Sequence, residues 1–111
     1  MSINGIYSII DMEKWDEDVL QMDGPAFIEI TDRSGRLHSV CVDGLLDVES
    51  SDDRIMFSWS GSDDGRPVGG AGFARLEGGV MKGRLWLHRG EHSDFTAVRG
   101  GISHKAKRKT V

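Results

Sequence analysis

Five side chains that could do acid–base or nucleophilic chemistry lie within seven residues near the C-terminal end of the chain. They are His88, Glu91, His92, Ser93 and Asp94. Imidazole, carboxylate and hydroxyl groups serve enzymes as general bases, acids and nucleophiles. Catalytic groups, however, normally converge on a pocket from distant segments, and a turn needs polar residues to remain solvated. We therefore expect a structural role, in which His88 hydrogen-bonds across a turn to Ser93 or Glu91.

The same turn could supply metal ligands, because His88 and His92 offer nitrogen atoms beside carboxylate oxygens. Two histidines four residues apart face one another on a helix, but the glycine and strand pattern here predicts a turn. The acidic pairs at 52–53 and 63–64 lack the alternating ligands of a calcium loop. We predict neither a metal site nor a cofactor, and no catalytic residue.

Cys41 is the only cysteine, so neither an intrachain disulfide nor a cysteine-rich zinc site can form. Val40 and Val42 flank it, which predicts a strand position and a packed thiol rather than a nucleophile. The glycines of segment 69–72 suggest a phosphate loop, but such loops lead into a helix and a strand is predicted to follow here. These glycines are therefore expected to let the chain bend into a sheet.

Arginines on the predicted strands have acidic neighbours, which favours cross-strand ion pairs over an anion pocket. The arginines are Arg75, Arg84 and Arg99, and the acidic residues are Glu77, Glu91 and Asp94.

Trp86 lies between Leu85 and Leu87 in a predicted strand, so its side chain points away from both leucines. If the leucines face the core, Trp86 lies on the outer face, where large aromatic residues anchor protein interfaces. Cover by the helix and stacking on a ligand are the alternatives. The other large aromatic side chains on the strands, Phe57, Trp59, Phe73 and Phe95, are expected to share an interior.

Period-two alternation predicts most of the chain to be strand. The expected strands are 26–31, 37–42 with a continuation to 48 beyond a bulge or bend at Gly44, 54–60, 72–76, 85–88 and 93–99. The glycine- and aspartate-rich segment from Gly61 to Gly70 is predicted to be the longest loop. A helix is expected from Met12 to Met22, with Trp15 and Val19 on the same stripe.

These elements predict a mainly β (β-rich α+β) domain: a small antiparallel six- to seven-stranded barrel-like meander with one N-terminal helix. A chain of 111 residues holds one domain, which we assign to residues 1–103. Residues 104–111 form a basic tail that we expect to be disordered.

Several short patterns near the predicted turns and strands resemble those of a set of small uncharacterised bacterial proteins. They are Trp59-Ser60-Gly61, Gly70-Ala71-Gly72-Phe73-Ala74-Arg75-Leu76, Gly79-Val80-Met81-Lys82-Gly83 and the run from His88 to Arg99, in which H-x-G-[DE]-x-S-x-F-x-A-x-R is matched. The likeness covers most of residues 6–99. It implies a bacterial origin and a compact β-rich fold and transfers no catalytic residue.

The distribution of charge along the chain indicates which classes of partner it can bind. All 18 acidic residues precede Phe95, whereas segment 104–109 carries four of the 14 lysines and arginines. An acidic body repels nucleic acid, which leaves only the tail for phosphate contacts. The chain shows neither a signal-peptide pattern nor an apolar run of membrane-spanning length, so we expect a cytoplasmic protein without membrane contact.

Three functional hypotheses follow. The first is a non-catalytic binding or interaction module that associates with itself, as a homodimer, or with a protein partner through a sheet face that includes Trp86. The second is a small-ligand-binding barrel with polar contacts from Trp59, His88 and Arg99 near the predicted 61–70 loop. A hydrolase-like or metal-dependent enzyme at the turn between His88 and His92 is the third.

Overall fold

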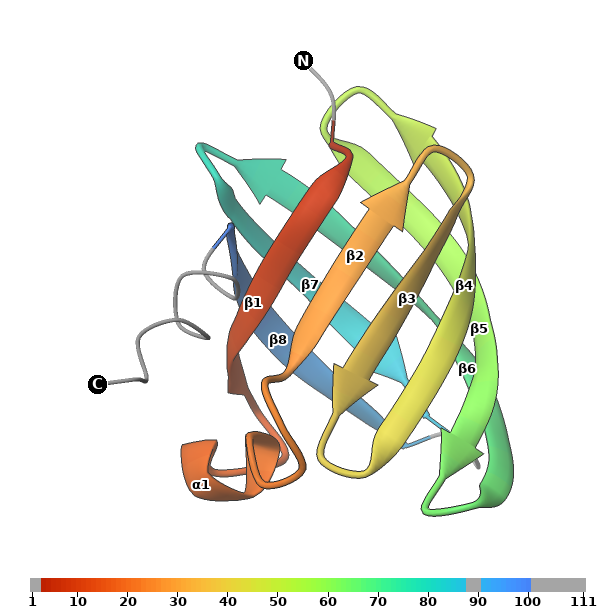
Figure 1. Ribbon diagram of the computed structural model, residues 1–111. Helices are drawn as coiled ribbons and strands as arrows, with labels where there is room; N and C mark the ends of the chain where they lie inside the picture. Colours follow the sequence, from red (N-terminus) through yellow and green to blue (C-terminus); the bar gives the residue numbers. More distant parts are fainter. Residues whose placement is uncertain (1–2, 88–90, 101–111) are drawn as a thin grey trace.

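The structure is a computed structural model in which residues 3–87 and 91–100 are described (Figure 1). These residues form eight strands and one short helix. In chain order the elements are β1 (Gly5–Met12), α1 (Glu17–Leu20), β2 (Phe27–Thr31), β3 (Ser34–Ser39), β4 (Val42–Ser51), β5 (Arg54–Asp63), β6 (Arg66–Glu77), β7 (Val80–Trp86) and β8 (His92–Arg99).

Each strand pairs antiparallel with the next, and β8 pairs with β1, so the sheet closes into a barrel in the order β1 to β8. The predicted mainly β antiparallel barrel is therefore confirmed, with eight strands instead of six or seven. The predicted tail, residues 104–111, and the last residues of the predicted domain, 101–103, lie outside the described residues.

The strand that the sequence did not predict is β1. The period-two pattern breaks after Ile9, where the pairing of β1 with β8 shifts register and both Ile10 and Asp11 are exposed. A bulge inserts one extra residue and moves the following side chains to the other face.

The predicted helix from Met12 to Met22 is wrong in extent, because only Glu17–Leu20 is helical. Met12 is the buried last residue of β1, and Trp15 packs against the core from the loop that follows. Val19 and Met22 are exposed, so the expected apolar stripe does not form. The pairing of β1 with β8 takes Met12, and the chain forms a loop at residues 13–16 before the short helix begins.

His38 of β3 holds the segment after α1 against the barrel. Its Nδ1 lies 2.7 Å from Asp43 Oδ1 and its Nε2 lies 2.7 Å from the Asp23 carbonyl oxygen. These two contacts join β3, the start of β4 and the segment before β2.

Other strand boundaries also differ from expectation: β3, β6 and β7 begin at Ser34, Arg66 and Val80, earlier than the expected 37, 72 and 85. Gly44 lies inside a continuous β4, and the chain reverses instead at Val40–Cys41, where Val40 has a left-handed φ of 58°. Valine rarely adopts this conformation, and for that reason the sequence predicted a strand at Val40 instead of a turn. The segment 61–70 is not a loop: β5 and β6 continue through it to a two-residue turn at Asp64–Gly65.

The barrel interior is built from large aromatic side chains that face glycines. Phe57 lies opposite Gly72 in the β5–β6 register, and a Cβ atom at Gly72 would sit 2.4 Å from Phe57 Cζ. Trp59 lies opposite Gly70 and also packs on Gly44, where a Cβ would sit 2.7 Å from Trp59 Cε3. The glycines thus make space for the rings inside a narrow barrel.

Phe95 joins Phe57 and Trp59 in the interior, but Phe73 does not, which corrects the expectation that all four share it. Phe73 is 45% exposed on the outer face of β6, because the neighbouring Gly72 and Ala74 take the inward positions.

We expect Gly72→Val to destabilise the fold by about 2 kcal/mol or more, because its side chain would overlap the Phe57 ring and overpacking carries a cost of this size. Ser51→Val, at an exposed strand position, is the matched control and should change stability by no more than about 0.5 kcal/mol. Urea unfolding midpoints measure both. Equal midpoints for the two variants would contradict the aromatic–glycine account of the core.

Candidate functional site

The outer face of β5 and β6 has no charged side chain over most of its length. Alternation places Met56, Ser58, Ser60 and Ser62 of β5 on this face. Their partners on β6 are Phe73, Ala71, Gly69 and Pro67, in that order. We call these eight residues the β5–β6 strip.

An apolar cluster occupies one end of the strip. Met56 is 64% exposed and pairs directly with Phe73 across the two strands. The Phe73 ring lies 5.7 Å from the Trp86 ring of β7, measured between centroids. Leu85 is buried while Trp86 lies on the outer face, as the alternation of β7 predicts. Exposed apolar side chains in contact with one another are typical of interaction surfaces.

The strip is flanked by strands of opposite charge. On its β4 side, the outward positions include Asp43, Asp47 and Glu49. On its β7 side, they include Lys82 and Arg84. The wall from β4 to β7 is therefore acidic along one flank, uncharged in the centre and basic along the other.

Arg84 is fixed in position by β8. Its Nε donates to Asp94 Oδ1 over 2.7 Å, and its guanidinium lies 5.8 Å from the centre of the Trp86 ring. The hydrogen bond from Arg84, together with its charge, lowers the pKa of Asp94 below the ordinary value, and the same contact raises the pKa of Arg84. This pair confirms the expected cross-strand pairing at Arg84, whereas Arg75 lies 3.6 Å from Glu77 of its own strand.

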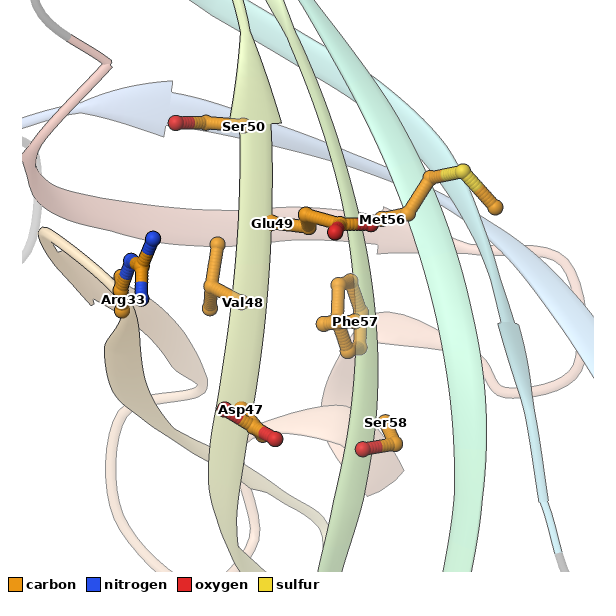
Figure 2. A pocket seen from close by; sticks show the side chains of 8 residues that line it. All are labelled: Arg33, Asp47, Val48, Glu49, Ser50, Met56, Phe57 and Ser58. Atoms are coloured by element: carbon orange, nitrogen blue, oxygen red, sulfur yellow. The ribbon is translucent and has the colours of Figure 1, made fainter.

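A solvent-open hollow of about 700 Å³ lies at the β4–β5 hairpin beside the strip. Figure 2 shows Arg33 and Ser50 on one side of the β4 ribbon and Glu49 and Met56 on the other. The hollow lies where β4 extends past the start of the antiparallel β3. Ser34, the first residue of β3, pairs with Asp47. One residue further along β4, Val48 N donates to the Arg33 carbonyl oxygen over 2.8 Å.

Of the three residues proposed from the sequence as ligand contacts, the two that the structure describes, Trp59 and Arg99, contact different parts of the barrel. Trp59 is buried, and its Nε1 donates to the carbonyl oxygen of Trp86 over 3.0 Å. Arg99 ends β8 beside β1, where Nη1 donates to the Asn4 carbonyl oxygen over 3.0 Å and the guanidinium lies 5.1 Å from the Tyr7 ring centre. His88 lies outside the described residues.

The described polar residues at the start of β8 make structural contacts. Ser93 is buried, and its Oγ donates to the Asp94 carbonyl oxygen and accepts from Lys14 N, both over 3.1 Å. His92 is exposed and lies 6.0 Å from Trp86 between ring centroids. Within residues 3–87 and 91–100, no three histidine, cysteine or acidic side chains are grouped so that they could hold a metal ion.

Cys41 lies in the β3–β4 turn and not in a strand, which corrects the expectation from its valine neighbours. Desolvation and then the charges of nearby aspartates raise the pKa of its thiol. A nucleophilic cysteine needs the opposite shift.

Comparison with protein-family models, curated protein sequences and solved structures finds no match to this chain. The resemblance to small bacterial proteins therefore stays a prediction. In the described part of the chain, no helix has the length and apolar character needed to cross a membrane.

Sequence reasoning found Trp86 but missed Met56 and Phe73. The signal was present for Phe73, since Ala74 and Leu76 are the apolar inward residues of β6 and Phe73 alternates with both. Met56 similarly alternates with the inward Ile55 and Phe57.

The Arg84–Asp94 pair predicts a pH effect of defined sign. Because the pKa of Asp94 is lowered in the fold, the stability that the pair contributes is present above the ordinary pKa of aspartate and is lost as pH falls through the lowered value. Carbon-detected NMR titration of the Asp94 carboxyl should give a midpoint below the ordinary aspartate value. In Arg84→Met the midpoint should rise towards that value, and an unchanged midpoint would contradict the assigned cause.

Proposed function

We propose that this protein is a non-catalytic interaction module that binds a protein partner through the outer wall formed by β4 to β7. The observation that carries the proposal is the outer-face apolar cluster of the exposed Met56 and Phe73 with the half-buried Trp86. Aromatic residues and methionine are enriched in the centres of protein interfaces, and charged residues are depleted there. The uncharged strip between two charged flanks has this arrangement.

Closure of the barrel favours contact through outer-wall side chains over contact through a strand edge. Each described strand is hydrogen-bonded to a neighbour on both sides. A partner strand therefore finds no edge that is open along a whole strand, although residues 48–51 of β4 extend beyond the pairing with β3, and β-augmentation is disfavoured as a binding mode. Side chains on the outer wall remain as the means of recognition.

The interior gives less support to the alternative of a small-ligand-binding barrel. An eight-stranded barrel is just wide enough to be filled by side chains or to hold one small ligand. Here the inward positions of the described strands carry Phe57, Trp59, Met81, Leu85 and Phe95, all of them buried. The indole nitrogen of Trp59 already has a backbone partner.

Photocrosslinking tests the proposal. A benzophenone amino acid placed at Met56 should form covalent adducts with a protein partner in cells of the natural host. The matched control carries the same probe at Ile10, which is 49% exposed on β1, across the barrel from β5. We expect adducts from position 56 and none from position 10.

Adducts are resolved by mass after purification through a tag on this chain. Equal yields from both positions, or none from position 56, would refute the β4–β7 wall as the contact surface.

A further inference from the structure

We infer that the partner is a second copy of this chain, which docks face to face about a twofold axis running parallel to β5 and β6 and between them. This inference rests on the proposed use of the β4–β7 wall and adds the identity and orientation of the partner. Its basis is a self-complementary order of side chains across the four strands.

One cross-strand row carries the argument. The pairing registers align Glu49, Met56, Phe73 and Arg84 on β4, β5, β6 and β7 in that order. All four lie on the outer face. The row therefore runs from acidic through two apolar residues to basic, and the basic Arg84 is also paired with Asp94 of β8.

Rotation about the proposed axis reverses this order on the facing copy. Glu49 then lies opposite Arg84 of the second copy, and Met56 lies opposite Phe73 of the second copy. The symmetry repeats both contacts, so each dimer gains two Glu–Arg pairs and two Met–Phe contacts. A sheet whose two flanks carried the same charge would repel its own copy in this arrangement.

The remainder of the strip permits close approach. The rows beyond Met56 and Phe73 pair Ser58 with Ala71 and Ser60 with Gly69, which are small and uncharged.

The size of the wall sets an upper limit on the contact. Four strands about 4.8 Å apart and about ten residues long, at about 3.4 Å per residue, cover roughly 650 Å² on each copy. Because the wall is convex, two copies would bury less than the roughly 1,300 Å² that contact over the whole of it would give, which places the dimer at the small end of specific interfaces.

One row opposes the arrangement and is neutralised. Arg54 of β5 would face Arg75 of the second copy, since these residues pair in the β5–β6 register. Asp53 lies 3.8 Å from Arg54 and 3.7 Å from Arg75, measured between carboxylate oxygen and guanidinium nitrogen. Its carboxylate reduces the repulsion on each copy.

Charge reversal tests the inference, with sedimentation equilibrium over a concentration series as the readout. The unchanged protein should dimerise. Glu49→Arg and Arg84→Glu should each weaken self-association by at least about tenfold, because each places like charges together twice. An equimolar mixture of the two variants should dimerise again, since both contacts are restored in the heterodimer.

Asp18→Arg, an equal charge change at an exposed position of α1, is the control and should dimerise like the unchanged protein. Misfolding cannot imitate the expected pattern, because two misfolded chains would not restore one another on mixing. Glu49→Arg also leaves the Arg84–Asp94 hydrogen bond in place.

A monomeric protein, or variants that dimerise unchanged, or a mixture that stays monomeric, would each overturn the inference. A monomer whose position-56 probe crosslinks a different protein would refute the dimer and leave the proposed interaction surface standing. A dimer that persists without crosslinks from position 56 would refute that surface.

Discussion

The packing of Phe57 and Trp59 against glycines on adjacent strands sets the geometry on which the other features depend. A Cβ atom at Gly72 or Gly44 would overlap these rings, so the interior accepts the aromatic side chains only because the facing positions lack side chains. Inward positions are fixed at every second residue of a strand, which fixes the outward ones too. Met56 and Phe73 are thereby placed on the outer face, and a one-residue shift of either strand would bury them and expose the rings.

Much of the fold follows from alternation alone. Segments 54–60 and 93–99 show a clear period of two, and both are strands with the expected inward faces. Alternation fails where another constraint decides the structure. The bulge in β1 hides its pattern, and the reversal at Val40 depends on a conformation that valine seldom adopts. Long-range pairing of β1 with β8 limits the helix, and a local helical spacing carries no information about that partner.

The candidate surface was predictable in part. The position of Trp86 between two leucines was enough to place it outside, and Leu85 is buried as this requires. The cluster around it depends on registers between strands that are distant in sequence, such as Phe73 opposite Arg84. Register is set by turn lengths and by packing. The prediction that segment 61–70 is a loop put the β5–β6 turn in the wrong place, so the register of these strands could not be predicted. The charged flanks become visible only once β4 and β7 are placed on either side of the strip.

Closure of the barrel then limits how such a protein can make contacts. Hydrogen bonds on both sides of every described strand protect the chain from edge-to-edge association, which an open sheet of this composition would risk. Side chains that fill the interior leave the wall as the variable surface. On that wall, apolar contact supplies affinity without direction, whereas the separation of acidic β4 from basic β7 distinguishes one orientation from its reverse. A protein with the same apolar cluster between two like-charged flanks would have no such preference.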